Sequence, residues 1–322
     1  MKQGLVVGKF MVLHSGHVAL IRFAAAHCDV LSVIVIGSTH DPIAAPQRLE
    51  WLKQEFRAYV KIKAEILVDD YPQTQGAWSD NINRWAPRIK EKTGTPDLVF
   101  SSASYGGILA DFFGVPHVPF DMDRQEVSIS ATDIMEHSFF HWDFVASSAR
   151  PYFVKRICFY GPESTGKSTM AQRMAARFQT VSVPEVAREF ITSNQFTVDD
   201  VVRIGHAQAD RLRQGTLAAN KILFCDTDLI TTQIYSQVYL NTVPDILYSL
   251  EKETPMDYYF LFDVDVPWVA DGLRDLGGKR QEMMEIFRNN LDHRGIKYTL
   301  ISGTYEQREA RVMEAMNAIL AS

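Results

Sequence analysis

A glycine-rich segment in the middle of the chain has the spacing of a phosphate-binding loop. Residues 161–169 read Gly-Pro-Glu-Ser-Thr-Gly-Lys-Ser-Thr, which matches GxxxxGK[ST], and they directly follow an apolar stretch at 157–160. The glycines of such a loop let backbone N–H groups surround a phosphate, while the lysine reaches the β- and γ-phosphates. We predict that Lys167 binds phosphate and that Ser168 is a ligand of Mg²⁺. The predicted nucleotide contacts are Gly161, Glu163, Ser164, Thr165, Gly166, Lys167, Ser168 and Thr169.

Acidic side chains follow two other apolar stretches of the same half. A phosphate-binding loop needs a carboxylate at the end of a neighbouring buried strand to hold the metal. Asp226 follows residues 222–225, and we expect it to bind Mg²⁺. Either Asp228 or Glu185 is expected to accept the proton of the substrate hydroxyl. Arg274 precedes a pair of glycines, and we expect it to reach the transferring phosphate from a lid.

A second set of residues near the N-terminus also suits phosphate chemistry. Residues 8–17 read Gly-Lys-Phe-Met-Val-Leu-His-Ser-Gly-His, where a first strand is expected to turn into a helix. His14 and His17 then face one side of the helix start and can bind phosphate oxygens, while Gly16 allows close approach of the backbone. This pattern favours nucleotidyl transfer, in which the protein mainly positions the reactants and neutralises charge. The predicted ATP contacts are Gly8, Lys9, Phe10, Gly16 and, at a helix cap in 129–132, Ser130 and Thr132.

The whole sequence alternates apolar stretches with amphipathic ones, which is typical of parallel sheets with crossover helices. A chain of 322 residues is long enough for two such domains. The alternation lapses near Arg150, and Pro151 disfavours helix at the residue before it. We therefore predict an α/β protein with domains at 1–150 and 151–322. The predicted strands are 5–8, 30–37, 64–68, 98–101, 115–118, 156–160, 180–183, 222–225, 258–262 and 298–301, with helices such as 16–27 and 77–92 between them.

The composition argues against several other classes of protein. The protein has a net charge of −6 and a pI near 5.9, so it lacks the excess of basic residues that binding of nucleic acid requires. No apolar stretch approaches the roughly 18 residues needed to cross a membrane, and no secretory leader is recognisable, so we expect a cytoplasmic protein. The three cysteines are far apart and are expected to be buried thiols. The sequence is compatible with a homo-oligomer but does not fix the number of subunits.

Together these residues resemble the HxGH nucleotidylyltransferase superfamily. The order of the two domains narrows the likeness to the NadR-type bifunctional nicotinamide mononucleotide adenylyltransferase/ribosylnicotinamide kinase family, and the likeness covers nearly the whole chain. Besides the two phosphate motifs, it rests on the strings at 48–51, 129–132, 150–153, 185–190, 226–232 and 268–274.

The resemblance implies a Rossmann-like nucleotidyltransferase sheet followed by the sheet of a P-loop kinase. It implies that the second domain phosphorylates ribosylnicotinamide with MgATP, giving nicotinamide mononucleotide (NMN). The first domain would join NMN to ATP, giving NAD and pyrophosphate, so that the enzyme would act in NAD salvage. Some family members carry an N-terminal DNA-binding domain. The first expected strand here begins within a few residues of Met1, so we expect no such domain and no DNA partner.

The sequence departs from the family pattern at two positions. Val12 replaces a proline before the first histidine, and Met135 replaces the arginine of the string I-S-x-T-x-x-R. The second departure removes a guanidinium from the ATP phosphates and predicts a weak transferase. Two other interpretations remain. One is a coenzyme A synthase-like fusion acting on dephospho-coenzyme A, and the other is a nucleotide-sensing protein whose transferase half binds NAD without making it.

Overall fold

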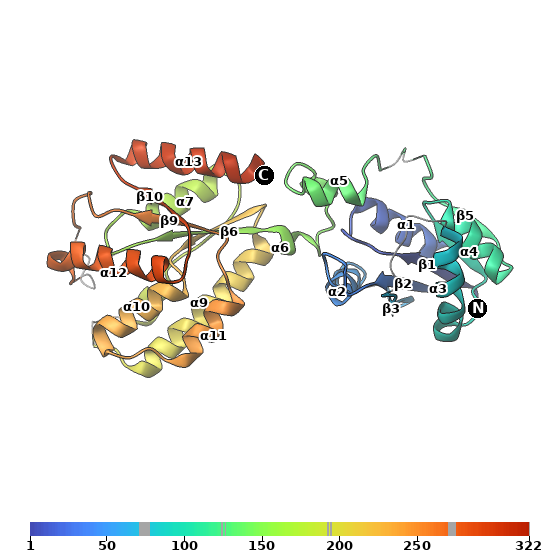
Figure 1. The fold of residues 1–322 in the computed structure, drawn as a ribbon, viewed down its shortest axis with the longest axis horizontal. Helices are drawn as coiled ribbons and strands as arrows, with labels where there is room; N and C mark the ends of the chain where they lie inside the picture. The colour runs from blue at the N-terminus through green and yellow to red at the C-terminus, as the bar shows by residue number, and fades with distance from the viewer. Residues whose placement is uncertain are drawn as a thin grey trace. The chain divides into compact units, whose positions relative to one another are not determined.

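The computed structural model describes residues 1–70, 78–123, 125, 127–191, 193, 195–269 and 275–321. The chain divides into two compact units, Met1–Tyr152 and Phe153–Ser322 (Figure 1). Strands and helices alternate along both, and each unit contains a parallel sheet of five strands, so the predicted α/β class is confirmed. Within the described residues, no helix is both long and apolar enough to span a bilayer.

The sheet of the first unit has the strand order β3-β2-β1-β4-β5. Its central strands are nearly continuous runs of β-branched and leucine residues, as expected for strands that are buried on both faces. The strands are β1 (Gln3–Gly8), β2 (Val30–Gly37), β3 (Ile62–Val68), β4 (Leu98–Ser101) and β5 (His117–Pro119).

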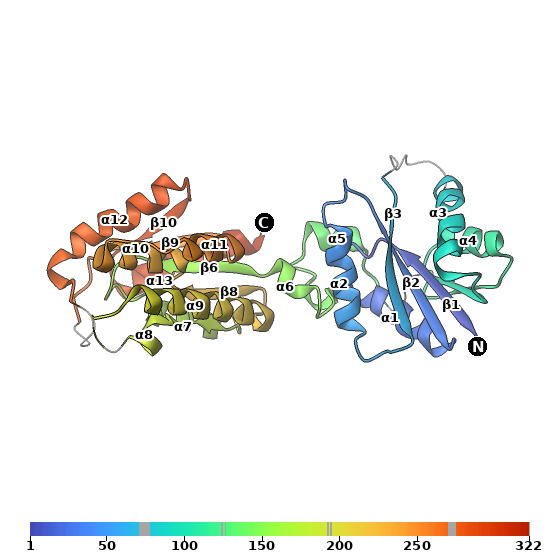
Figure 2. The same ribbon diagram turned by 90° about the horizontal axis from the view of Figure 1, so that it is seen from below.

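Helices cover both faces of this sheet, with α1 and α2 on one side and α3 and α4 on the other (Figure 2). On the second side, Leu5 and Val7 of β1 pack in one apolar cluster with Trp85, Ile89 and Leu109. The elements are α1 (Ser15–Ala26), α2 (Ala45–Glu55), α3 (Trp78–Thr93), α4 (Tyr105–Phe113), α5 (Ala131–Glu136), the 3₁₀ turn η1 (Trp142–Phe144) and α6 (Arg150–Phe153).

The sheet of the second unit has the order β10-β9-β6-β8-β7, and all of its strands are parallel. Side chains alternate between the two faces of β6. Phe159 packs with Met170 and Val312, whereas Tyr160 packs with Ile230 and Phe287. The strands are β6 (Lys155–Tyr160), β7 (Ser182–Val183), β8 (Ile222–Asp226), β9 (Tyr258–Phe262) and β10 (Tyr298–Ile301).

Helices α7 and α13 therefore cover one face of the second sheet, and α10 and α12 the other (Figure 1). The elements are α7 (Lys167–Arg177), α8 (Ala187–Phe190), α9 (Val198–Ala218), α10 (Leu229–Leu240), α11 (Asp245–Glu253), the 3₁₀ turn η2 (Gly277–Lys279), α12 (Arg280–His293) and α13 (Tyr305–Ala321).

In each sheet the strand order reverses at the strand that directly precedes a phosphate motif. Strand β1 lies between β2 and β4, and β6 lies between β8 and β9. Ligands of open parallel sheets bind in the crevice at the carboxyl ends of strands where the order reverses. The end of β1 at Gly8 and the end of β6 at Tyr160 are therefore the places to look for sites.

Candidate active sites

The glycine-rich loop of the second unit has the conformation that its glycines predict. Gly161 and Gly166 have φ angles of 135° and 89°, which side-chain-bearing residues rarely adopt. A Cβ on Gly161 would also lie 2.8 Å from the backbone oxygen of Phe262 on β9. Helix α7 begins at Lys167, so its N-terminal N–H groups face the cavity that the loop encloses.

Lys167, Ser168 and Asp226 come together in this cavity. The Lys167 ammonium donates to the carbonyl of Pro162 at 2.7 Å. Burial lowers the pKa of Lys167, and the nearby charges of Asp226 and Glu185 oppose that effect. Burial raises the pKa of Asp226, whereas the Lys167 charge and the Ser168 hydroxyl lower it, and among the described residues its Oδ1 is buried without a hydrogen-bond partner. A buried carboxylate oxygen beside a serine hydroxyl is the donor set that Mg²⁺ prefers.

Glu185 stands between the phosphate cavity and a second, neighbouring cavity, and it lines both. It follows β7, and its Oε2 accepts from Nε of Arg188 at 3.2 Å. Its charge acts on the pKa values of both Lys167 and Asp226, which places it at the centre of the site. This is where a base for a substrate hydroxyl must lie.

Asp228 lies at a different place from Glu185, at the start of a helix. It is the N-cap of α10, where Oδ1 accepts from the backbone N–H of Thr231 at 2.9 Å and from its hydroxyl at 3.0 Å. Its Oδ2 accepts from the Tyr259 hydroxyl at 2.7 Å. Among the described residues, Asp228 lines a separate cavity beside Glu251 instead of the phosphate cavity. Both oxygens serve the helix cap and the core, so Glu185 remains as the candidate base.

The predicted lid begins against the phosphate loop. The backbone N–H of Val269 donates to the Ser164 hydroxyl at 2.8 Å. Arg280 donates to the Val266 carbonyl at 2.8 Å and to the Ser164 carbonyl at 3.3 Å. The predicted phosphate ligand Arg274 lies outside the described residues, so its role stays a prediction.

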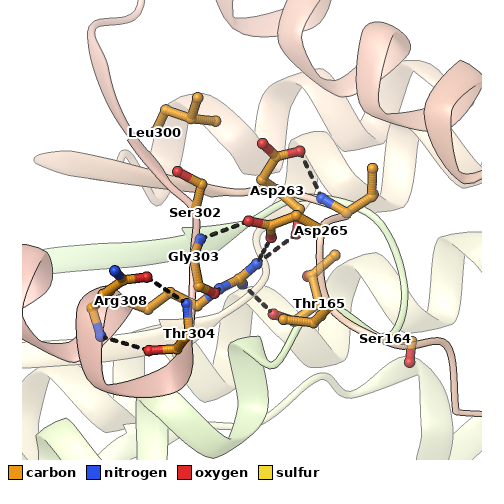
Figure 3. A network of polar contacts seen from close by, with 12 residues as sticks. Ser164, Thr165, Asp263, Asp265, Leu300, Ser302, Gly303, Thr304 and Arg308 are labelled. Atoms are coloured by element: carbon orange, nitrogen blue, oxygen red, sulfur yellow. Dashed lines mark hydrogen bonds and ion pairs between the residues drawn. The ribbon is translucent and has the colours of Figure 1, made fainter.

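A buried arginine of α13 fixes the outer side of the phosphate loop (Figure 3). Arg308 is fully buried and donates to the carbonyls of Gly303 at 2.9 Å, Thr165 at 2.8 Å and Asp263 at 3.1 Å. Its guanidinium also pairs with the Asp265 carboxylate. One side chain thus ties the phosphate loop to the ends of β9 and β10.

In the first unit, the residues predicted from the N-terminal motif surround one cavity. Trp85, Tyr105 and Phe120 are among the other residues of its wall. The predicted residues that line it are Gly8, Lys9, Phe10, His14, Gly16, His17, Ser130 and Thr132.

The two histidine rings lie close together at the start of α1, with centroids 3.9 Å apart and planes tilted by 38°. His14 is the N-cap, and its Nδ1 accepts from the backbone N–H of Gly16 at 3.1 Å. A Cβ on Gly16 would lie 2.9 Å from the His14 ring, so the glycine makes room for this ring. The absence of a side chain at Gly16 thus accommodates the His14 ring, and Gly16 itself lines the cavity.

His17 carries a ring nitrogen that is available for a ligand. Within the part of the chain that the structure describes, its Nδ1 is buried without a hydrogen-bond partner. Burial lowers the pKa of His17 well below its ordinary value, and the charge of His14 lowers it further. A triphosphate placed in the cavity supplies the opposite charge and would raise this pKa again.

The helix cap at α5 differs in detail from the prediction. Ser130 lines the cavity, but its hydroxyl donates to the Asp133 carboxylate at 2.6 Å and accepts from the Asp133 backbone N–H at 3.1 Å. This capping box occupies the hydroxyl that we expected to bind phosphate, whereas Thr132 is exposed at the cavity. Met135 is half-buried on α5 and is absent from the described residues that line the cavity.

A buried arginine also holds the phosphate turn of the first unit. Arg48 of α2 is fully buried and donates to the carbonyls of Lys9 at 2.5 Å and Ile36 at 3.0 Å. It pairs with Asp41 at 2.6 Å, and Asp41 also accepts from the Lys9 ammonium at 3.5 Å. Burial lowers the pKa of Arg48, which Asp41 opposes.

Sequence reasoning missed several residues that shape these sites. Within the sequence analysis Arg48 appears only in a family string, and Arg308 and Gln208 are not identified. Each stands among the buried apolar positions of a helix, which is the one signal that could have identified it.

Comparisons with known proteins agree with this geometry. The profile of a family described as "AAA domain" matches residues 156–308. The trifunctional NAD biosynthesis/regulator protein NadR of Escherichia coli (strain K12) is 30% identical over 98% of this chain and 83% of its own length. The NadR protein of Salmonella typhimurium (strain LT2) is 29% identical over the same shares.

The chain belongs to the NadR family. The chain also resembles a nicotinamide-nucleotide adenylyltransferase of Sulfurisphaera tokodaii, which is 28% identical over 114 residues, covering 32% of this chain and 64% of that protein. Two crystal structures share the fold, one of NadR protein in complex with NR and one in complex with NAD and AMP-PNP. Their TM-scores are 0.83 and 0.82 at 23% identity, over 98% and 100% of this chain and 95% and 96% of theirs. As a member of the NadR family, the chain is an enzyme with nucleotidyltransferase and kinase chemistry.

The Arg308 contacts predict a local effect on the phosphate loop. Arg308→Met removes the donor to the Thr165 carbonyl and leaves the Asp265 carboxylate with the Gly303 N–H but without its guanidinium partner. We expect amide hydrogen exchange in residues 161–169 to accelerate at least about tenfold, because a tenfold change corresponds to only about 1.4 kcal/mol of opening free energy. Mass spectrometry of peptides measures it. The control is Arg311→Met at an exposed position of α13, and peptides covering 8–17 should not respond. Unchanged exchange in 161–169 would contradict the role of Arg308.

The lowered pKa of His17 predicts a proton uptake. The folded protein keeps this ring neutral at pH values where a free imidazole begins to protonate, so ATP binding near pH 6.5 should draw a proton onto it. Calorimetric titration with MgATP in two buffers of different ionisation enthalpy gives the number of protons. We expect His17→Asn to take up as much as about one proton fewer than the wild type when MgATP binds. His27→Asn, on an exposed residue after the same helix, is the control. Equal uptake by the wild type and His17→Asn would contradict the assignment.

Proposed function

We propose that this protein makes NAD from ribosylnicotinamide in two steps. Its second unit phosphorylates ribosylnicotinamide with MgATP to NMN, and its first unit transfers an adenylyl group from ATP to NMN, giving NAD and pyrophosphate. The observation that carries the proposal is the pair of joined cavities in the second unit. The phosphate cavity shares six lining residues with an apolar cavity beside it: Glu163, Glu185, Arg188, Thr227, Thr231 and Tyr235. A nucleoside in the apolar cavity would have its hydroxyl at the phosphate loop.

In the kinase step, the 5′-hydroxyl oxygen of the nucleoside attacks the γ-phosphorus of ATP, and ADP leaves. The carboxylate of Glu185 accepts the hydroxyl proton. Lys167 holds the β- and γ-phosphate oxygens, and Ser168 with Asp226 would hold Mg²⁺. The metal, when bound, neutralises charge that develops on those oxygens. The unpartnered Oδ1 of Asp226 supports this ligand set, because a buried carboxylate oxygen is costly without a partner.

In the transferase step, a phosphate oxygen of NMN attacks the α-phosphorus of ATP, and pyrophosphate leaves. No protein nucleophile takes part, so the catalytic task is to position the two phosphates and to neutralise their charge. His14, His17 and Lys9 are the polar groups at the cavity that suit this task. The likeness of part of the chain to an enzyme named nicotinamide-nucleotide adenylyltransferase supports this activity.

One coupled assay tests the two steps separately. With ribosylnicotinamide and MgATP, the wild type should form NMN and then NAD, as resolved by chromatography. Lys167→Ala removes the ammonium that binds the β- and γ-phosphates, and we expect its NMN formation to fall at least about a hundredfold. The same variant supplied with NMN should make NAD at the wild-type rate, which serves as the internal control.

Other outcomes of this assay favour other functions. Phosphorylation of dephospho-coenzyme A in place of ribosylnicotinamide would indicate a coenzyme A synthase-like fusion. Binding of NAD without its formation from NMN would indicate a sensing role for the first unit. NMN formation by Lys167→Ala near the wild-type rate would refute the assignment of the kinase site.

Met135 predicts that the transferase step is the slower one. A thioether cannot donate to phosphate, and removing one such donor in other enzymes costs on the order of a hundredfold in rate. We expect Met135→Arg to raise kcat/KM for NAD formation from NMN about tenfold, equivalent to about 1.4 kcal/mol of transition-state stabilisation. Met135→Gln, which adds a polar group without the charge, is the control. A wild-type transferase rate equal to the kinase rate and unchanged by Met135→Arg would show that another cation, such as Lys9, already fills this place.

A further inference from the structure

Gln208 is a buried polar side chain of the apolar cavity beside the phosphate loop, and the proposed mechanism does not use it. Gln208 of α9 is 2% exposed and lines this cavity but, among the described residues, is absent from the wall of the phosphate cavity. Its neighbours on the buried stripe of α9 include Val201, Ile204 and Leu212. An apolar residue is the ordinary choice at such a position, so the amide needs partners.

Only one end of the Gln208 amide has such a partner. The backbone N–H of Val186, just before α8, lies 3.1 Å from the side-chain oxygen. An N–H group can donate only, so the atom facing it must be the oxygen, and this contact fixes which way the amide is turned. The NH₂ group then points elsewhere, and Nε2 is buried without a hydrogen-bond partner among the described residues.

The position of Gln208 determines which part of a nucleoside it meets. The 5′-hydroxyl of the nucleoside must lie where the two cavities join, beside Glu185. Gln208 lines the apolar cavity but, among the described residues, not the phosphate cavity that joins it, so we place it at the end of the nucleoside that carries the base. Phe196 and Tyr239 line the same cavity with ring centroids 5.4 Å apart, and aromatic faces attract a cationic ring such as a pyridinium.

We propose that the NH₂ group of Gln208 donates a hydrogen bond to a carbonyl oxygen on the base and thereby selects nucleosides that carry one. This inference rests on the proposed kinase function and adds a specificity-determining residue to it. A buried NH₂ group can only donate, and the exocyclic carbonyl of nicotinamide is the strong acceptor at that end of the substrate. A base without the carbonyl would leave the NH₂ group without a partner in the complex, which is how polar pockets reject such analogues.

The test compares two substrates in three proteins. Kinase kcat and KM are measured with ribosylnicotinamide and with ribosylpyridinium, which has the same charge and ribose but no carbonyl. The proteins are the wild type, Gln208→Met, which has a similar length but no amide, and Gln214→Met, at an exposed position of the same helix. The quantity compared is the ratio of kcat/KM for ribosylnicotinamide to kcat/KM for ribosylpyridinium. Damage to folding, or loss of the Val186 contact, affects both substrates and cancels in this ratio.

We expect the ratio to fall at least about tenfold in Gln208→Met, mainly through a higher KM for ribosylnicotinamide, and to stay unchanged in Gln214→Met. An equal loss with both substrates, or no loss with either, would overturn the inference and leave Gln208 a residue that holds α8. Failure of the wild type to phosphorylate ribosylnicotinamide would instead refute the proposed function. If Gln208→Met is too unstable to assay, Gln208→Glu keeps an acceptor for Val186 and must show the same fall in the ratio.

Discussion

A phosphate-binding turn directs its backbone N–H groups toward the ligand, so its carbonyl groups point into the protein and need buried donors. Both units meet this requirement with the guanidinium of a fully buried arginine on a covering helix. Arg48 donates to the carbonyl of Lys9, and Arg308 donates to the carbonyl of Thr165. A guanidinium can serve several carbonyls at once because its five N–H groups diverge in one plane. An aspartate, Asp41 or Asp265, compensates the buried charge in each case.

The sheets determine where the two turns lie, and the arginines then hold the carbonyl groups of these turns. In each unit the motif follows the strand at which the strand order reverses, so the turn opens into the crevice at the carboxyl edge of the sheet. The helix that follows the turn then presents its N-terminus to the same crevice. The covering helices α2 and α13 bring the guanidinium to the outer side of the turn, which the local sequence of the motif cannot do.

Some of the buried polar atoms without partners lie at the same crevices. They include Nδ1 of His17, Oδ1 of Asp226 and Nε2 of Gln208, within the part of the chain that the structure describes. Each costs folding free energy, on the order of 1–3 kcal/mol for a neutral group. The large apolar clusters that pack on the sheets stabilise the fold, and this stability offsets the cost of the unpartnered polar atoms. A phosphate, a metal or a base that binds there supplies the missing partner of such an atom, and the binding free energy is correspondingly more favourable.

The sequence by itself determined the α/β class, the positions of the strands and the two phosphate motifs. These depend on local patterns, namely runs of apolar residues and glycines where a left-handed or crowded backbone excludes other residues. The tertiary structure decided the partners of the polar groups. It placed Asp228 at a helix cap, gave the Ser130 hydroxyl to Asp133, and set Arg48, Arg308 and Gln208 against turns far away in the sequence. A hydrogen bond depends on distance and direction in space, and residues 143 positions apart, such as Arg308 and Thr165, meet only when the whole sheet has formed.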